Sequence, residues 1–170
     1  HVFGTGTHET TRLCIELIEK HMREGEKVLD IGCGSGILSI ASLLLGASHA
    51  DAVDIDPNAV DIAYTNAGMN GIGRDTYTVV SGNILADDEL DKTYSGKKYD
   101  VVEANIVADV IIALTEKIPK YIKDGGIFVS SGIIVERLDD VLEALKSRGF
   151  ALIEVVKDKG WAAVASKYEG

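Results

Sequence analysis

Cysteine and histidine are scarce in this chain. Its 170 residues contain only two cysteines, Cys14 and Cys33. Four histidines are scattered along the chain, at positions His1, His8, His21 and His49. A disulfide framework or a zinc cluster needs more cysteines, or histidines at ligand spacing. The sequence therefore predicts neither a disulfide framework nor a metal site.

Long apolar runs are also lacking. The longest nearly uncharged apolar stretch, residues 37–47, is too short to cross a bilayer, which takes roughly 20 residues. No basic segment followed by an apolar one opens the sequence. These absences predict a cytoplasmic protein without a membrane partner. Because 46% of the residues are hydrophobic, we expect one domain over residues 1–170 with a well-buried core.

Positive charge is in deficit, and the formal net charge is −10. Such a charge argues against direct binding to nucleic-acid phosphates. It is compatible with a basic protein partner, but it also has a simpler interpretation, since acidic surfaces keep domains soluble. Charge alone does not decide between these two interpretations.

Helix and strand patterns alternate along the chain, which is typical of an α/β fold. Apolar runs predict seven strands, at residues 27–31, 49–55, 76–80, 99–104, 126–131, 151–156 and 161–166. Amphipathic patterns predict helices at residues 7–22, 36–45, 58–70, 107–118 and 135–148, with Pro119 interrupting or ending the fourth. We expect the polar stretch 87–98 to be a surface loop and residues 124–126 to form a turn.

The last two predicted strands are joined by only four residues, Lys157–Gly160. A parallel crossover needs a dozen or more residues, so these strands are expected to be antiparallel. The sequence therefore predicts a doubly wound, mostly parallel seven-stranded sheet with one antiparallel strand, which is a Rossmann-like α/β fold.

A glycine-rich segment follows the first predicted strand. Residues 28–36 have the sequence Val-Leu-Asp-Ile-Gly-Cys-Gly-Ser-Gly, and the second strand ends near Asp54. Glycines let the backbone turn and approach a ligand closely, and a carboxylate after the second strand is placed to hold a ribose diol. This arrangement predicts a site for a nucleoside-containing cofactor.

The glycine spacing distinguishes between cofactors. In the dinucleotide pattern G-x-G-x-x-G the last glycine permits close packing of helix on strand, but Ile37 occupies that position here. The third glycine is Gly36, one residue earlier. The resulting G-x-G-x-G after an acidic residue resembles the first motif of class I S-adenosylmethionine methyltransferases, and the antiparallel strand pair agrees with their architecture. The predicted cofactor is therefore S-adenosylmethionine.

Ligands of open α/β sheets lie at the carboxyl ends of the strands. The backbones of Gly32 and Gly34 are expected to approach the methionyl and ribose parts of the cofactor. Asp54 is expected to accept hydrogen bonds from both ribose hydroxyls. Two roles are open for Asp30, which could bond loop amides or, through water, the ammonium of the cofactor. Asp56 is expected to cap the next helix rather than to bind ligand.

Three further residues each have two possible roles. Asn83 could contact the adenine edge with its amide, or it could simply form a loop. Asn105 could orient an attacking amine near the transferred methyl group, or it could cap the following helix. Cys33, in a loop at a helix start, could be a nucleophile or a small packed residue.

The segment Val2–Thr11 has glycines alternating with hydroxyl residues directly before a helix. It could close over the cofactor as a lid, with Phe3 packing and a threonine hydroxyl reaching the cofactor carboxylate. Alternatively, it is a helix cap with a frayed end.

The sequence resembles the bacterial ribosomal protein L-eleven methyltransferase family over essentially its whole length. The matching segments are Phe3–His8 with Thr10 and Thr11, Asp30–Leu38, Val53–Pro57, Asn105–Ala108 and Gly160 with Trp161. The resemblance implies methyl transfer to the N-terminal amine and lysine side chains of a basic ribosomal protein. It also implies cofactor contacts by Thr11, Gly32, Asp54 and Asn105.

Two residues depart from the family pattern: Glu9 replaces a usual proline and Val107 a usual leucine. Neither change removes a polar contact. The sequence begins at His1 without an initiator methionine. We therefore expect that the N-terminal substrate-recognition domain of the family is absent, so that the chain binds cofactor yet methylates poorly.

The expected mechanism is in-line displacement by a neutral amine, promoted mainly by alignment of the reactants, with Asn105 as the orienting residue. An α-amine, with a pKa of roughly 7.7 to 8.0, is partly neutral at cellular pH, whereas lysine needs desolvation or a base. No residue is assigned as that base. The alternatives are a nicotinamide dehydrogenase, a class I methyltransferase acting on a small molecule or another protein, and a non-catalytic cofactor-binding module.

Overall fold

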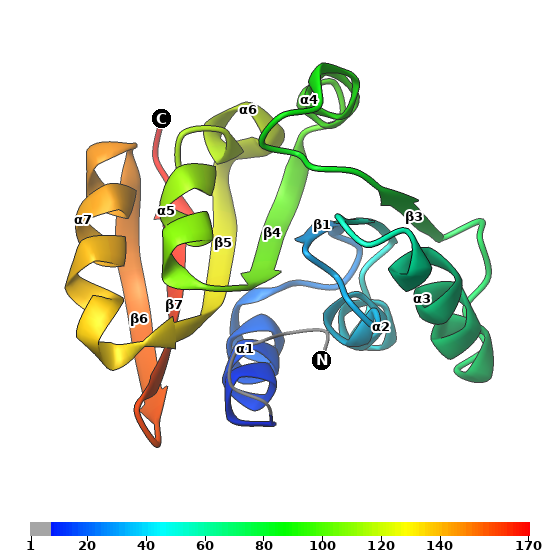
Figure 1. The fold of residues 1–170 in the computed structure, drawn as a ribbon, viewed down its shortest axis with the longest axis horizontal. Helices are drawn as coiled ribbons and strands as arrows, with labels where there is room; N and C mark the ends of the chain where they lie inside the picture. Colours follow the sequence, from blue (N-terminus) through cyan, green and yellow to red (C-terminus); the bar gives the residue numbers. More distant parts are fainter. Residues whose placement is uncertain (1–7) are drawn as a thin grey trace.

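The computed structural model describes residues 8–170, which form one seven-stranded sheet flanked by helices (Figure 1). The strands are β1 (Lys27–Ile31), β2 (His49–Asp54), β3 (Tyr77–Ser81), β4 (Tyr99–Asn105), β5 (Ile122–Ile134), β6 (Phe150–Asp158) and β7 (Trp161–Tyr168). The helices are α1 (His8–His21), α2 (Ile37–Leu44), α3 (Asn58–Met69), α4 (Asp88–Ser95), α5 (Ala108–Leu114), α6 (Ile118–Tyr121) and α7 (Leu138–Ser147), with a 3₁₀ turn at Val135–Arg137.

The strand order is β3-β2-β1-β4-β5-β7-β6, and β7 alone runs antiparallel to its neighbours. The predicted fold class is thus confirmed. The order reverses between β1 and β4, whose carboxyl ends face the same edge. Open α/β sheets bind ligands at such a switch point, so the topology places the glycine loop after β1 where a ligand would enter.

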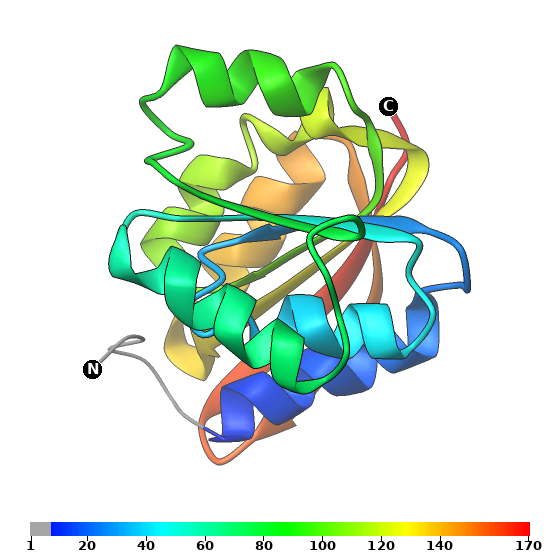
Figure 2. The same cartoon turned by 90° about the vertical axis from the view of Figure 1, so that its right-hand side faces the viewer.

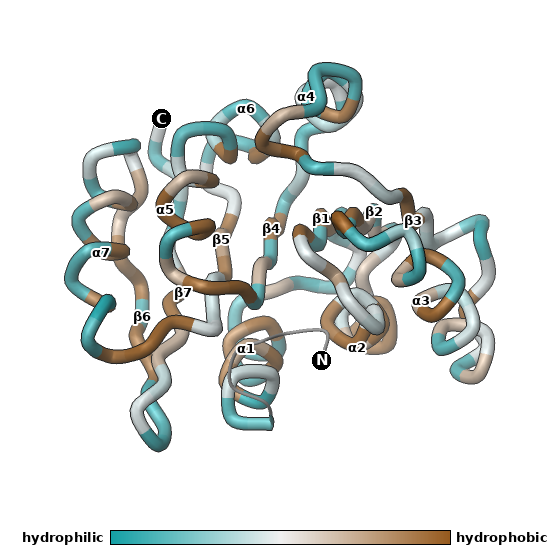
Figure 3. The backbone as a smooth tube through the Cα atoms, viewed as in Figure 1, coloured by the Kyte–Doolittle hydropathy of each residue, from teal (hydrophilic) through white to brown (hydrophobic). Residues whose placement is uncertain are grey.

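The helices divide between the two faces of the sheet. Figure 2 shows α1, α2 and α3 on one face and α4 to α7 on the other. The largest hydrophobic cluster lies under α5, α6 and α7 and includes the fully buried Tyr121 and Phe128. On the opposite face, Leu13 and Leu17 of α1 pack against Val129 of β5. Hydrophobic residues accordingly concentrate on the strands and on α2, and hydrophilic ones on the outer side of α7 (Figure 3).

The prediction of a loop at residues 87–98 is wrong, because this segment contains α4. Asp87 caps the helix: its Oδ1 accepts hydrogen bonds from the backbone N–H of Glu89 (3.0 Å) and Leu90 (3.2 Å). One aromatic side chain anchors it, since Tyr94 is buried against the ring of Tyr99. The polar composition concealed a short helix stabilised by its cap and a single buried ring.

Several predicted boundaries also shift. Strand β5 includes residues 124–126, where a turn before the strand was expected. These residues instead interrupt the regular pairing of β5 with β4. Pro119 lies in the first turn of a separate helix, α6, where its missing N–H costs nothing. The final hairpin has a two-residue loop, because Asp158 pairs with Trp161. Both loop residues have positive φ, as in a type I′ turn.

A buried carboxyl group fixes the amino ends of β2 and β4. Asp51 is 2% exposed and accepts hydrogen bonds from the hydroxyl of Tyr99, from His49 Nε2 (2.9 Å) and from Lys97 Nζ (3.1 Å). Burial alone would raise the pKa of Asp51, but these three bonds favour the ionised form, and the pKa is lowered overall. The charge of Asp51 therefore stabilises the folded state.

Replacing this carboxylate is expected to destabilise the protein. Asp51→Asn should lower the free energy of unfolding by about 2 kcal/mol, because buried donors lose a charged acceptor. Since the pKa is lowered on folding, the contribution is fully present above the unfolded value of about 3.9 and is lost as the pH falls through the folded value. Urea unfolding at several pH values measures this.

Asp100→Asn is the control, because Asp100 lies at the same strand ends but is partly exposed, and it bonds Lys123 Nζ (3.0 Å) and the backbone N–H of Lys27 (2.9 Å). This variant should lose about 0.5 kcal/mol. A difference between wild type and Asp51→Asn that already closes between about pH 7 and 5, where an Asp51 carboxylate of lowered pKa stays ionised, would contradict the assignment to Asp51.

Candidate cofactor site

A cavity of about 410 Å³ opens at the carboxyl ends of the central strands. This volume lies within the usual range of small-molecule sites, about 300 to 1,000 Å³. Its lining comes from the ends of β1 and β2, the turn after β3 and the segment after β4: Ile31, Gly32, Val53, Asp54, Ile55, Gly82, Asn83, Ile84, Leu85, Ile106, Val107, Val110 and Leu114. The wall is largely apolar, with a carboxylate and an amide as its polar side chains.

The loop that borders this cavity requires glycine at two or more positions, because a side chain there would not fit. Gly32, Gly34 and Gly36 all have positive φ, at 75°, 53° and 85°. A Cβ at Gly32 would lie 2.8 Å from the side chain of Ile106, and one at Gly36 would lie 2.8 Å from the hydroxyl of Tyr77. These glycines are therefore needed for the conformation and packing of the loop itself, in addition to any approach of its backbone to a ligand.

Asp54 ties the loop to the end of β2. Its Oδ2 accepts a hydrogen bond from Gly34 N (2.8 Å), and its Oδ1 accepts one from Asp56 N (2.9 Å). The side chain is half-buried at the cavity wall. Because each carboxylate oxygen can accept more than one hydrogen bond, both retain capacity for a ligand hydroxyl.

The neighbouring Asp56 has the capping role expected from the sequence. Its Oδ1 accepts a hydrogen bond from Asn58 N (2.9 Å), and Pro57 has helical dihedral angles. This cap fixes the start of α3 directly beside Asp54.

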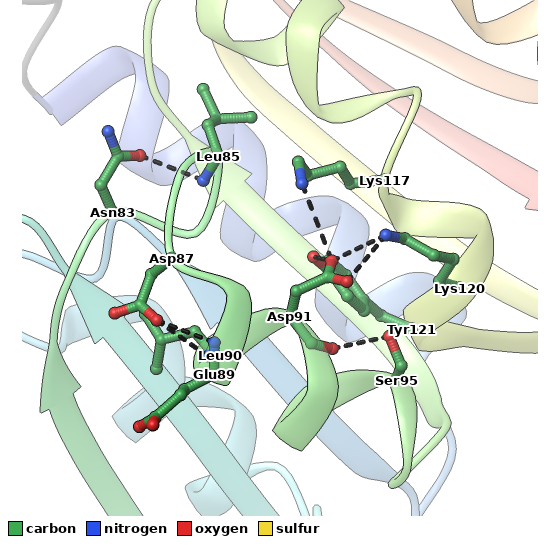
Figure 4. A network of polar contacts seen from close by, with 10 residues as sticks. All are labelled: Asn83, Leu85, Asp87, Glu89, Leu90, Asp91, Ser95, Lys117, Lys120 and Tyr121. Carbon is green, nitrogen blue, oxygen red and sulfur yellow. Dashed lines mark hydrogen bonds and ion pairs between the residues drawn. The ribbon is translucent and has the colours of Figure 1, made fainter.

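Asn83 forms a turn, which confirms one of its two interpretations. Its Oδ1 accepts a hydrogen bond from Leu85 N (3.1 Å), and its backbone carbonyl accepts one from Asp87 N (2.8 Å). Figure 4 shows the amide nitrogen turned away from Leu85. Asn83 is exposed and lines the cavity, so this nitrogen remains accessible to a ligand.

The segment after Asn83 is anchored at its far end. Asp91 of α4 bonds Lys120 Nζ through both oxygens (2.8 and 2.9 Å) and accepts a hydrogen bond from the hydroxyl of Tyr121 (2.6 Å) (Figure 4). These bonds, led by those from Lys120, lower the pKa of Asp91. They hold α4 against α6 and thereby hold the turn at Asn83 over the cavity.

Asn105 and Thr11 are brought together from distant parts of the chain. Asn105, the last residue of β4, is 3% exposed, and its Nδ2 donates to Thr11 Oγ1 of α1 (3.4 Å). The capping interpretation is wrong, because α5 begins after Val107 without a side-chain cap. Neither Asn105 nor Thr11 lines the 410 Å³ cavity.

One buried polar atom beside this pair lacks a partner. Within residues 8–170, Asn105 Oδ1 has no hydrogen-bond donor. Gly132 packs directly against it, since a Cβ there would lie 3.0 Å from this oxygen. A buried acceptor without a donor is costly, so an additional donor is expected at this position. The predicted lid lies outside the described residues up to position 7, Phe3 included, and its last residues, 8–11, belong to α1.

Two further expectations concern the loop and the strand before it. Asp30 accepts hydrogen bonds from the backbone N–H (3.2 Å) and the hydroxyl of Ser39, so it bonds the first turn of α2 rather than a loop amide. Cys33 is not an activated nucleophile: it is buried, and burial, assisted by the charges of Asp30 and Asp54, raises its thiol pKa far above the ordinary value. The thiol is a packed side chain.

No three His, Cys, Asp or Glu side chains among residues 8–170 are grouped so that they could hold a metal ion. None of the helices in this range combines the length and the apolar character needed to span a membrane.

Comparison with known proteins identifies the family. The model of the family described as ribosomal protein L11 methyltransferase (PrmA) matches residues 1–169. This chain belongs to the L11 methyltransferase family. The resemblance noted in the sequence is thereby confirmed.

Curated relatives and solved structures of the L11 methyltransferase family agree. A ribosomal protein L11 methyltransferase of Clostridium botulinum (strain Eklund 17B / Type B) is 46% identical over 165 residues, covering 97% of this chain and 50% of the relative. One from Lachnospira eligens is 40% identical, covering 97% of this chain and 52% of the relative. The chain thus spans about half the length of the curated relatives it matches.

The crystal structure of a ribosomal protein L11 methylase from Lactobacillus delbrueckii subsp. bulgaricus has the same fold. Its TM-score is 0.87 at 30% identity, and the match covers 97% of this chain and 81% of that chain.

The packing of the L11 methyltransferase loop can be tested with one pair of glycines. Gly36→Ala should destabilise the fold by about 3 kcal/mol, because it combines positive φ with close contacts to Tyr77 and Ala63. Gly71→Ala is the matched control: Gly71 has φ of 74°, but nothing lies within 4 Å of an added Cβ. It should lose only about 1 kcal/mol, from backbone strain. Equal losses in thermal unfolding would show that the close contacts are unimportant.

Proposed function

We propose that this chain binds S-adenosylmethionine in the cavity at the ends of β1, β2 and β4 and methylates ribosomal protein L11. The observation that carries the proposal is the family match, which covers the complete cavity and its polar residues. By the same proposal, the acceptors are the N-terminal amine and lysine side chains of that protein. The net charge of −10 suits a basic partner, and the reaction would take place in the cytoplasm, where ribosomes are.

The residues of the cavity fit the parts of this cofactor. Asp54 would bind the ribose hydroxyls with the acceptor capacity left on its two oxygens. Ile55 and Val107, which are 71% and 45% exposed, would cover the faces of the adenine ring, and the amide nitrogen of Asn83 would donate to its edge. Gly32 and Gly34 would allow the cofactor to approach the loop backbone.

The polar pair beside the cavity suits the reacting end. When bound, S-adenosylmethionine supplies a methyl group on a positively charged sulfur. Thr11 and Asn105 would hold the methionyl end, and Asn105 Oδ1, which has no donor within residues 8–170, would accept a hydrogen bond from the incoming amine. Asn105 would thereby orient the nitrogen lone pair and stabilise the charge that develops on nitrogen.

The cofactor assignment can be tested by isothermal titration calorimetry. The wild-type chain should bind S-adenosylmethionine and S-adenosylhomocysteine but not NAD. Asp54→Ala should weaken S-adenosylmethionine binding at least about tenfold, because hydrogen bonds to a charged acceptor are lost.

Asp56→Asn is the matched control, because asparagine also caps helices and the site does not use Asp56. Its affinity for S-adenosylmethionine should match that of the wild type. Binding of NAD in preference to S-adenosylmethionine would favour a dehydrogenase and end the proposal.

The role of Asn105 requires a methylation assay with recombinant ribosomal protein L11, followed by mass spectrometry. Asn105→Ala should reduce the rate on the order of a hundredfold, because the amine loses its orienting acceptor. Thr11→Val, which keeps the side-chain shape, should have a smaller effect. Undiminished methylation by Asn105→Ala with cofactor bound would refute the orienting role. A wild-type chain that binds cofactor but leaves this protein unmethylated would contradict the proposed acceptor.

A further inference from the structure

Two carboxyl groups lie next to each other in the interior beneath the glycine loop. Asp30 of β1 and Glu103 of β4 are partners in the register of these parallel strands, and both are fully buried. Adjacent strands lie about 4.8 Å apart, and side chains at paired positions point to the same face. The cofactor contacts proposed above include neither group, and Glu103 is not among the site residues predicted from the sequence.

The surroundings of this pair contain acidic or neutral groups. The titratable groups nearby are Cys14 of α1, Cys33 of the loop, Asp54 of β2 and Tyr77 of β3. On the side of β5, Glu103 is paired with the apolar Val129. Among residues 8–170, no lysine, arginine or histidine bonds either carboxyl group of the pair. Two negative charges would lack a counter-ion, so one proton is expected to remain on the pair at neutral pH.

The hydrogen bonds to one oxygen of Asp30 suit the ionised form, whereas its Oδ1 has no partner within residues 8–170. Its Oδ2 accepts from both the backbone N–H and the hydroxyl of Ser39. Ser39 lies in the first turn of α2, where the helix dipole favours a negative charge. The charge of the pair is therefore best placed on Asp30.

The contacts of Glu103 are also compatible with the protonated form, because the Ser42 hydroxyl near it has a second acceptor, the carbonyl of Leu38. The two carboxyl oxygens of Glu103 lie 3.2 and 2.9 Å from the hydroxyl oxygen of Ser42, which also lies 2.9 Å from the carbonyl oxygen of Leu38. A serine hydroxyl has one proton and can donate to only one of these groups. If it donates to Leu38, a protonated Glu103 can donate to Ser42, and every contact is satisfied.

The pKa values of the two groups agree with placing the charge on Asp30 and the proton on Glu103. Burial raises the pKa of Glu103 well above its ordinary value and the charge of Asp30 raises it further, while the hydrogen bond from Ser42 opposes the increase. Burial raises the pKa of Asp30 to about 7, while the hydrogen bonds from Ser39 oppose the increase. Asp30 therefore ionises first as the pH rises, and Glu103 retains its proton.

We propose that Glu103 is a positioning residue that acts through Asp30. By keeping the proton of the pair, it leaves a single negative charge on Asp30 beneath the loop, and this charge favours a sulfonium cation over the corresponding neutral thioether in the adjoining cavity. The inference rests on the proposed function. S-adenosylmethionine and its product S-adenosylhomocysteine differ by a methyl group and the charge on sulfur, so such a charge would favour cofactor over product.

Calorimetry of the 170-residue chain with both ligands, from about pH 6 to 8.5, tests this proposal. A bound cation favours ionised Asp30, so the affinity for S-adenosylmethionine should rise with pH up to about 7 and then level off. The affinity for S-adenosylhomocysteine should change less. Asp30→Asn should abolish the rise and reduce the preference for S-adenosylmethionine on the order of tenfold.

Glu103→Gln separates the roles of the two carboxyl groups. The glutamine amide is neutral and can donate to Ser42, so this variant should retain both the preference and its rise with pH. If Glu103→Gln instead loses the preference as Asp30→Asn does, the charge lies on Glu103 and the proposal is overturned. Asp51→Asn is the control, since it removes a buried carboxylate at the opposite ends of the strands and should lower stability without changing the preference.

Carboxyl-carbon NMR of the wild-type chain gives an answer even if a variant fails to fold. At about pH 8 the buried carboxyl group that remains protonated should be a glutamate, and an aspartate there would overturn the proposal. The outcomes also distinguish this proposal from the proposed function. If the wild type binds neither ligand, the proposed function fails; if it binds both and Asp30→Asn leaves their ratio unchanged, only the present inference fails.

Discussion

The whole site depends on how the last two residues of β2 hold the glycine loop. The carbonyl of Val53 accepts hydrogen bonds from the N–H groups of both Gly32 (2.8 Å) and Cys33 (3.1 Å), and the carboxylate of Asp54 accepts one from Gly34. Three consecutive loop amides are thus satisfied by two consecutive residues of the neighbouring strand. The loop and the proposed ribose-binding carboxylate form one unit, so the position of Asp54 is set before any ligand arrives.

Much of this arrangement could be predicted from the sequence, because each signal is local. A β-branched strand, a run of glycines and an acidic residue after the next strand specify the switch point and its cavity. The short connection before Trp161 required an antiparallel strand. Asp56 and Pro57 marked the start of α3 because a cap and a fixed φ act within one helical turn.

The errors arose where a single distant contact decides the structure. Helix α4 has a polar sequence, and Tyr94 reaches the core only because Tyr99 and Tyr121 are there to pack with it. Asn105 looked equally suited to cap a helix, and only the fold places Thr11 beside it and starts α5 after Val107. Neither the ring cluster nor the amide pair has a sequence spacing from which it could be recognised.

The importance of the buried acidic pair likewise depends on contacts that form only in the folded protein. Glu103 is the one charged residue in the otherwise apolar run 101–104, and this could have been noticed as an anomaly. Its significance appears only when β4 pairs with β1 and opposes it to Asp30, while α2 supplies Ser39 and Ser42. Buried polar groups that break the apolar pattern of a strand are expected near functional sites, where a charge can be needed even though its burial lowers stability.

The two halves of the site meet at the end of β4. Side chains alternate between the faces of a strand, so consecutive residues are directed to different environments. Asn105 contacts Thr11 of α1, whereas Ile106 packs over Gly32 and lines the cavity. A single step along the backbone therefore separates the polar position proposed for the reacting amine from the apolar wall proposed for the nucleoside.

The register of β4 against β1 fixes the positions of Asn105 and Ile106 together, since Ile31 pairs with Ala104 immediately before these two residues. In the proposed site, the alignment of donor and acceptor would thus be set largely by the sheet.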